Sequence, residues 1–374
     1  MIRIVPVKSK KELMKFIKFP FALYKNEPNW TPPLISEQKK FFHPQKNPYF
    51  EHSEAQLFLA YKGDDLVGRI SAHTNTQHNK THDDRVGFFG FFESINDQEV
   101  ANSLLDAAIA WLTAKKCDAI RGPMNFSVNH ECALLVDGFE TPSCIMLPYN
   151  FRYYKDLLEN AGLKKVMDMY SYYIKVVPSP ARVSRLAEKI QKRYNITLRE
   201  LSKNKKDMKK DLETIFTVYT KAWENNWGFV PMTKKEFDHT VKELMPLAVP
   251  EFIYIAEIEG KPAGISITLP DYHFVLRKMN GRIFPFGLFK ALYYKNKISR
   301  LRVPIMGVVD KYKNKGVDVL FYHRSFETAM RYHDKYHDAE FSWILENNVA
   351  MNRVAETIGG RIYKTFRIYE KSIV

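Results

Sequence analysis

Residues 303–330 read VPIMGVVDKYKNKGVDVLFYHRSFETAM, and this stretch decides the fold class. Its first part is an apolar run that ends at Val309 and predicts a buried strand. A short polar turn follows at 311–316. A helix is expected from Val317, because apolar residues then recur at helical spacing. Strand, turn and helix in this order are typical of an α/β protein.

The turn has the composition of an anion-binding loop. Lys311, Lys313 and Lys315 bring positive charge, and Gly316 allows a ligand to approach the backbone. Successive N–H groups at a helix N-terminus can hold a pyrophosphate. Taken alone, the loop also fits a plain strand-to-helix connection with solvated lysines.

Outward from this stretch, the two halves of the chain repeat each other. LFLAYKGDDLVGRISA at 57–72 matches FIYIAEIEGKPAGISI at 252–267, and both are typical of a β-hairpin. AGLKKVMDMYSYYIK at 161–175 matches IGGRIYKTFRIYEK at 358–371, where a glycine at a helix end precedes an alternating strand. The repeat predicts two domains of one fold.

The length of 374 residues agrees with this division, since a domain takes about 150 residues. Two prolines in Val177-Pro-Ser-Pro180 interrupt both periodicities and mark the seam. We therefore expect one domain at 1–178 and a second at 179–374.

Each half is expected to be a mixed α/β sheet, because a strand, a helix and a strand in that order imply a right-handed parallel crossover. The elements expected in the first half are strand 3–8, helix 10–25, the hairpin at 57–72, strand 86–92, helix 98–114 and strand 119–122. Those expected in the second half are strand 196–201, helix 210–225, the hairpin at 252–267, strand 302–309, helix 317–332, strand 339–345, helix 349–357 and a final strand.

Two segments carry a resemblance to a known family. Lys313-Asn-Lys-Gly316-Val-Asp318 resembles motif A of the GNAT (Gcn5-related) N-acetyltransferases, Gln/Arg-x-x-Gly-x-Gly/Ala. ENNVAMNRVAETIGG at 346–360 resembles their motif B, with Asn348 and Gly359 at the motif's spacing. The resemblance covers 180–374 and implies tandem GNAT-like acyl-CoA N-acyltransferase domains.

The first half resembles a degenerate copy of the same family. Its strand-to-helix turn at 93–99 is acidic and lacks glycine, so it would repel a pyrophosphate. The segment 153–162 is still similar to a motif B helix. One acyl-CoA site is therefore expected, in the second half.

The resemblance implies acetyl-CoA or a longer acyl-CoA as co-substrate, and no metal. A neutral amine must attack the thioester, so a base has to remove the ammonium proton. Asp310 and Glu346 follow the two parallel strands, where ligands bind, and either could be that base; solvated carboxylates are the alternative. The residues that the resemblance assigns to the co-substrate are Gly307, Val308, Val309, Lys311, Lys313, Lys315, Gly316, Val317 and Asn348.

Two positions depart from the family pattern. Asp318 stands where motif A has its second Gly or Ala, close to the expected phosphate. Ala355 stands where the family usually carries the tyrosine that protonates the departing thiolate. Another donor, or water, is then needed.

The charge balance points to an anionic partner. Fifty-seven Lys and Arg against 42 Asp and Glu give a net charge of +15. Three cysteines without CxxC spacing fit a reducing compartment. No stretch approaches eighteen apolar residues, so a cytoplasmic protein is expected, peripheral at most to the inner membrane face.

The segment 272–302 is basic and aromatic, without one acidic residue. Such a segment fits an anionic lipid surface, and no RNA-binding motif favours nucleic acid; a lid over the substrate cleft is the other interpretation. Its basic residues are Arg277, Lys278, Arg282, Lys290, Lys295, Lys297, Arg300 and Arg302, and its interleaved aromatic residues are Phe284, Phe286, Phe289, Tyr293 and Tyr294.

These patterns together favour an acyl-CoA-dependent N-acyltransferase that acts on a small or lipid-like amine. A FemABX-type transferase that uses aminoacyl-tRNA is one alternative, and a GNAT-fold binding protein without catalysis is another. His73, His78 and His82 lie in a polar stretch without metal-ligand spacing, so no metal site is expected there.

Overall fold

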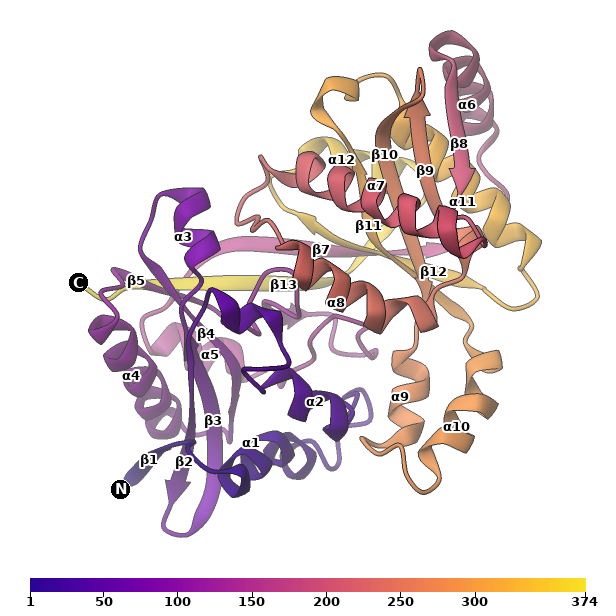
Figure 1. Ribbon diagram of the computed structural model, residues 1–374. Helices are drawn as coiled ribbons and strands as arrows, with labels where there is room; N and C mark the ends of the chain where they lie inside the picture. Colours follow the sequence, from indigo (N-terminus) through magenta and orange to yellow (C-terminus); the bar gives the residue numbers. More distant parts are fainter. The chain divides into compact units, whose positions relative to one another are not determined.

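The computed structural model describes residues 1–374, and the chain packs as two compact units (Figure 1). Unit 1 contains Met1–Tyr170, His273–Tyr294 and Tyr363–Val374, and unit 2 contains Ser171–Tyr272 and Lys295–Ile362. These units are not the consecutive halves 1–178 and 179–374, because two later segments pack with the first. The expected boundary stays a prediction about where the sequence repeat divides.

Unit 1 is built on a mixed sheet. Its strands follow the order β1-β2-β3-β4-β5-β13, and β6 pairs with β13. The neighbours β4 and β5 run parallel, as the expected crossover requires, and the hairpin β2–β3 is antiparallel. The strands are β1 (Ile2–Pro6), β2 (Ala55–Lys62), β3 (Asp65–His73), β4 (Val86–Ser94), β5 (Ala119–Gly122), β6 (Leu134–Asp137) and β13 (Arg361–Ser372).

Helices cover the sheet of unit 1. The crossover helix α4 begins after Asp97, whose carboxylate accepts the Glu99 N–H at 2.9 Å, and it buries Leu104, Leu105 and Ala108. This apolar stripe was readable from the sequence, and the expected bounds of the helix are confirmed. The helices are α1 (Lys10–Leu23), α2 (Ile35–Phe41), α3 (Thr76–His82), α4 (Gln98–Ala114), α5 (Tyr154–Asn160), α9 (His273–Met279), α10 (Gly287–Tyr294) and the 3-10 turn Pro48–Glu51.

Unit 2 repeats this plan with the strand order β8-β9-β10-β11-β12. Parallel pairing joins β11 to β12, and the remaining neighbours are antiparallel. The strands are β8 (Ile196–Glu200), β9 (Ile253–Ile258), β10 (Lys261–Pro270), β11 (Arg300–Val308) and β12 (Asp338–Leu345); β7 (Lys164–Lys175) leads from unit 1 into unit 2. The mixed α/β sheets expected from the sequence are confirmed.

The helices of unit 2 include two that the sequence did not predict, α6 (Ala181–Tyr194) and α8 (Lys234–Leu244). Helix α6 follows the prolines of the expected seam, and only Ala187 of its side chains is buried, so its polar sequence carries little apolar periodicity. The helices are α6 (Ala181–Tyr194), α7 (Lys205–Trp223), α8 (Lys234–Leu244), α11 (Val317–Arg331) and α12 (Val349–Thr357), with 3-10 turns at Met245–Leu247, Pro250–Phe252, Lys295–Lys297 and Asp310–Tyr312.

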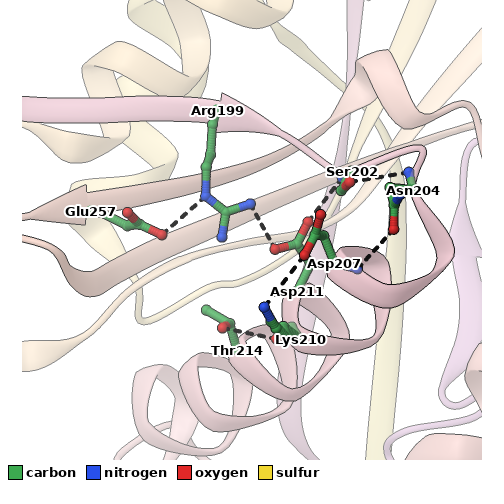
Figure 2. A network of polar contacts seen from close by, with 8 residues as sticks. All are labelled: Arg199, Ser202, Asn204, Asp207, Lys210, Asp211, Thr214 and Glu257. Atoms are coloured by element: carbon green, nitrogen blue, oxygen red, sulfur yellow. Dashed lines mark hydrogen bonds and ion pairs between the residues drawn. The ribbon is translucent and has the colours of Figure 1, made fainter.

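A polar network fixes α7 to the sheet of unit 2 (Figure 2). Arg199 on β8 contacts Asp211 of α7 at 2.7 Å and Glu257 of β9 at 3.0 Å. Asn204 caps α7 by accepting the Lys206 N–H, so the helix begins five residues before the expected start at 210. The extra turn is polar, which explains why apolar periodicity missed it.

Candidate active site in unit 2

The strands β11 and β12 separate near the middle of the sheet. Their pairing runs from Arg300 opposite Asp338 to Val303 opposite Phe341, although β11 continues to Val308 and β12 to Leu345. Ligands of α/β proteins bind at the carboxyl ends of parallel strands. The separation therefore provides the expected crevice.

A small cavity, with a volume of about 60 Å³, lies against the paired part of the two strands, and Met306 extends its wall toward their separation. Val303 and Phe341 line it from the strands, and Tyr322 lines it from α11. The hydroxyl oxygens of Thr268 and Ser325 also face buried surroundings in its wall and have no hydrogen-bond partner. The cavity thus combines apolar walls with polar groups that a ligand or a water molecule can satisfy.

The lysine turn forms the start of α11, as the sequence predicted. Within it the amides of Tyr312, Lys313 and Lys315 donate to carbonyl oxygens of the turn itself. Gly316 takes the left-handed conformation, with φ 75°, and precedes Val317, the first residue of the helix. In the first turn of the helix the Val319 and Leu320 amides donate to Gly316 O, and the Asp318 carboxylate accepts backbone N–H groups of Asp318 and Val319. A pyrophosphate at this helix N-terminus would therefore compete with the Asp318 carboxylate for those donors.

Helix α6 packs against the turn at Gly316. A Cβ on Gly316 would lie 2.4 Å from Ile190 Cδ1, and the Lys315 ammonium lies 5.7 Å from the ring centre of Tyr194. Glycine is therefore required here by packing as well as by backbone conformation. The sequence could not show this second constraint, because α6 was not expected.

The lysines of the turn differ in their surroundings. Lys311 and Lys313 are exposed, but Lys313 contacts Asp310 Oδ1 at 2.5 Å. This ion pair, together with a hydrogen bond from Asn225 Nδ2 at 2.8 Å, lowers the pKa of Asp310 below its usual value. A carboxylate held in its ionised form is a weak base, so the surroundings favour Glu346 over Asp310 for proton removal.

Glu346 is half-buried at the end of β12, where Asn352 anchors the neighbouring backbone. The Asn352 amide donates to Leu345 O at 3.0 Å, and its Oδ1 accepts the Tyr172 hydroxyl at 3.0 Å. Asn348 caps α12 by accepting the Met351 N–H at 3.3 Å. The motif B asparagine thus has a structural role, and its contact with the co-substrate stays a prediction.

The other expected co-substrate residues lie in β11 and at the start of α11. Gly307 and Val308 pair with β10, and the Val309 amide donates to Ala263 O at 2.9 Å. The Val317 side chain is buried in the core, so only its backbone could contact a ligand. Their contacts with acyl-CoA stay predictions.

Asp318, which departs from motif A, lies one helical turn before Tyr322 on α11. Burial raises the pKa of Asp318, and burial followed by the charge of Asp318 raises the pKa of Tyr322. The Tyr322 hydroxyl lies 3.2 Å from Met351 Sδ. Ala355 is fully buried, so its position cannot present a hydroxyl, whereas Tyr322 lines the cavity with a phenol that stays protonated. The sequence showed Tyr322 only as an apolar helix position.

The strand-to-helix turn of unit 1 has a different character. Its helix α4 is capped by Asp97, which also contacts Lys62 at 2.9 Å. A carboxylate already occupies the place where an anion would approach the helix. That unit 1 has no pyrophosphate site stays a prediction.

The segment 272–302 divides between helices and a strand. Helices α9 and α10, which we call the α9–α10 hairpin, belong to unit 1 and expose Phe284, Phe286 and Phe289 by 77%, 69% and 69%. Arg302 is instead buried in β11, where its Nε donates to Ser342 at 3.2 Å, and Arg300 pairs with Asp338. These two arginines therefore do not belong to the exposed basic surface.

The three histidines considered for a metal site lie in unit 1. Burial lowers the pKa of His73 to about 3 and that of His78 to about 4. His78 Nε2 lies 3.2 Å from Asp84, and its ring centre lies 4.4 Å from that of His82.

None of the helices combines the length and the apolar composition that a membrane span requires.

Comparison with known proteins adds sequence relatives and a structural neighbour. Protein YghO of Escherichia coli is 35% identical over 374 residues, which cover 98% of this chain and 94% of the relative. A protein named bacterial ceramide synthase, from Caulobacter vibrioides, is 34% identical over 380 residues, with 100% and 98% covered. No family model matches the chain.

Among solved structures, a tandem GNAT protein from the clavulanic acid biosynthesis pathway matches with a TM-score of 0.56. The match covers 100% of this chain and 99% of that one at 10% identity. At that identity the match shows the fold, which is the tandem GNAT fold.

Proposed function

Because the chain belongs to the family of YghO and bacterial ceramide synthase and has the tandem GNAT fold, we propose that it is an acyl-CoA-dependent N-acyltransferase. The observation that carries the proposal is the lysine turn at the start of α11, beside the separated strands β11 and β12. A helix N-terminus with lysines suits a pyrophosphate, and the crevice suits the thioester arm. Acyl-CoA supplies the activated carbonyl.

We assign the chemistry to residues around that crevice. Glu346 removes the proton of the amine, directly or through water, so that the neutral nitrogen can attack the carbonyl carbon. A C–N bond forms as the C–S bond breaks, and the departing thiolate takes a proton. Tyr322 is the hydroxyl placed to give that proton, because it lines the cavity and keeps its phenol protonated.

The acceptor that we favour is a lipid-like amine. The relative named bacterial ceramide synthase supports an acceptor of this class. The α9–α10 hairpin supports it independently, because its exposed phenylalanines are accompanied by the exposed cations Lys278, Arg282 and Lys290. Apolar anchors among cations are typical of proteins that bind anionic bilayers from one side.

Calorimetric titration with CoA and acyl-CoA tests the cofactor assignment. Removing two lysines, with Lys311→Ala and Lys313→Ala together, should weaken CoA binding at least about tenfold, since each charge-assisted contact contributes more than a neutral one. Lys209→Ala removes a matched exposed lysine from α7 and should leave the affinity unchanged.

One CoA per chain is the expected stoichiometry, because unit 1 lacks a suitable turn. Equal affinity in the double variant and the wild type would contradict the site. CoA binding without acyl transfer to any amine would instead support the non-catalytic alternative, and preference for aminoacyl-tRNA over acyl-CoA would support the FemABX-type alternative.

A further inference from the structure

A larger cavity lies within unit 1, where β4 and β5 separate. Its volume is about 260 Å³. Pairing of the two strands ends at Phe88 opposite Arg121, and the Asn125 side chain then accepts the Phe91 N–H at 2.8 Å. The end of β4, the segment after β5 and the first turn of α9 contribute to the wall. No step of the proposed reaction uses this cavity.

The charge of the wall is opposite to that of the whole protein. Three carboxylates, Glu37, Glu93 and Glu131, line the cavity against one guanidinium, Arg69. The chain as a whole carries a net charge of +15. An acidic cavity in a basic protein favours a cationic ligand over an anionic one.

The two carboxylate oxygens of Glu93 differ in their hydrogen bonds. Its Oε2 accepts the hydroxyls of Tyr24 at 2.6 Å and Tyr154 at 2.8 Å. Its Oε1 lies 3.6 Å from Arg69 Nη2, which is too far for a good hydrogen bond. The tyrosines therefore orient the carboxylate and leave one oxygen available to a stronger donor.

Arg69 shows that the polar groups of this wall are incompletely satisfied. The residue is only 7% exposed, and its Nη1 donates to Phe16 O at 2.8 Å, but its Nε has no partner. Buried polar groups normally find partners in protein, water or ligand. The unpaired Nε–H is a donor, so water or another acceptor would satisfy it and an ammonium would not. The case for a cationic head therefore rests on the carboxylates of the wall.

The rest of the wall is apolar. Trp30, Leu34, Phe92, Leu147 and Leu276 line the cavity beside the carboxylates. A ligand that satisfies both parts has a small cationic head and a hydrocarbon chain. A volume of about 260 Å³ holds such a head and the first part of the chain, with the remainder outside.

The α9–α10 hairpin joins this cavity to the exposed apolar surface. Leu276 and His273 of α9 line the cavity, and His273 Nδ1 lies 2.9 Å from Ser143 O. Gly281, between the helices, accepts the Ile35 N–H through its carbonyl at 3.0 Å and packs against Phe21. Helix α9, which lines the cavity, is thus joined to α10 by the connection that carries the exposed Phe284 and Phe286.

We propose that the unit 1 cavity binds the ammonium head of a long-chain primary amine, with Glu93 Oε1 as its principal acceptor. The proposal rests on the proposed function in one respect, since such an amine is the class of acceptor that the transferase would use. It concerns binding alone. Carboxylates disfavour an anionic head, and a neutral alcohol would lack the attraction between opposite charges that an ammonium gains from Glu93.

Calorimetry of the full-length protein tests the proposal with dodecylamine, dodecanol and dodecanoate, each below its micellar concentration. Dodecylamine should bind at least about tenfold more tightly than dodecanol, the difference expected for one charge-assisted hydrogen bond. Equal affinity for amine and alcohol would overturn the proposal.

Variants locate the binding site. Glu93→Gln should weaken dodecylamine binding at least about tenfold and leave dodecanol binding unchanged. Glu131→Gln changes a wall residue that does not contact Tyr24 or Tyr154. If Glu93→Gln folds poorly, weaker dodecylamine binding in Glu131→Gln still tests the cavity. Glu54→Gln is the matched control, because Glu54 is exposed and does not line the cavity. Wild-type amine affinity in both wall variants would place the amine elsewhere and overturn the proposal.

The CoA titrations separate this proposal from the proposed function. Glu93→Gln should keep its CoA affinity, and the double lysine variant should keep its amine affinity. If the wild-type protein binds CoA but does not prefer dodecylamine to dodecanol, the cavity proposal alone is overturned. If it binds dodecylamine selectively but does not bind CoA, the transferase proposal alone is overturned.

Discussion

At the end of β4 unit 1 carries Glu93, and at the equivalent place in β11 unit 2 carries Gly307. The strand registers establish the equivalence: Glu93 lies opposite Arg69, one residue after Gly68, and Gly307 lies opposite Ile265, one residue after Gly264. In both hairpins this glycine also pairs with an alanine of the preceding strand, Gly68 with Ala60 and Gly264 with Ala256.

The residues around Glu93 and Gly307 also differ, being polar in unit 1 and aromatic in unit 2. In unit 1 the Tyr24 hydroxyl bonds to Glu93. In unit 2 the ring of Trp223 fills the space, since a Cβ on Gly307 would lie 2.3 Å from Trp223 Cη2. Tyr24 directly follows α1, and Trp223 is the last residue of α7. One copy of the fold thus keeps a polar cavity where the other is filled by an aromatic ring.

The strand-to-helix turns of the two units differ in charge. Unit 1 caps α4 with Asp97, and unit 2 begins α11 after Gly316 with three lysines nearby. Unit 1 therefore suits a cation and unit 2 suits an anion. The difference teaches that two copies of one fold can carry opposite charges at equivalent places.

The largest effect is expected when the unit 1 residue is placed in unit 2. Gly307→Glu would force the side chain against Trp223 and bury a carboxylate without a partner, so we expect the free energy of unfolding to fall by about 3–5 kcal/mol. Denaturant unfolding measures it. Gly260→Asn, in an open turn of the same unit, should cost no more than about 1 kcal/mol, and an equally small effect of Gly307→Glu would contradict the comparison.

Acid should weaken unit 1, because its buried histidines resist protonation. The folded pKa values of His73 and His78 are about 3 and about 4, below the unfolded value, so the unfolded chain binds protons that the folded chain does not. Stability is therefore fully present above pH 6.5 and falls as pH decreases toward the folded values, by about 2 kcal/mol for each histidine between pH 6.5 and 5.

Unfolding measured across that pH range checks this expectation, and hydrogen exchange shows which unit opens. His78→Asn should flatten the pH dependence whatever its effect at neutral pH. His333→Gln, at an exposed position in unit 2, should leave the slope unchanged. A wild-type protein equally stable at pH 5 and pH 7 would refute the prediction.

The smallest effects concern the connections between equivalent strands. In unit 1 the polar helix α3 joins β3 to β4, whereas β10 and β11 are joined through the α9–α10 hairpin. Binding to vesicles with anionic lipids should weaken by about 1 kcal/mol for each of Lys278, Arg282 and Lys290 that is changed to Ser.

Variants of the exposed phenylalanines test the same membrane contact. Phe286→Ser with Phe289→Ser should reduce vesicle binding even at low salt, because the rings enter the acyl region. Lys80→Ser on α3 is the matched control and should have no effect. Absence of sedimentation with anionic vesicles at low salt would rule out the membrane contact, and a preference for RNA would favour the nucleic-acid interpretation.

Much of the fold followed from local patterns in the sequence. Helices α4 and α12 have the expected bounds, because their caps Asp97 and Asn348 and their apolar stripes lie within the helix or beside it. Both hairpins and both parallel crossovers are confirmed for the same reason. The lysine turn before α11 was predictable because strand, turn and helix are contiguous.

Contacts between distant residues decided the rest. Ile190 against Gly316, Trp223 against Gly307 and the Tyr24–Glu93 bond each join segments that no local window contains. The same holds for the packing of His273–Tyr294 with unit 1 and for the ion pair that weakens Asp310 as a base. The sequence by itself determined the elements with strong apolar periodicity, the repeat and the position of the lysine turn, since periodicity and capping are local. Only the tertiary structure decided which unit each segment joins and where an acidic cavity lies, because burial and charge pairing depend on residues brought together by folding.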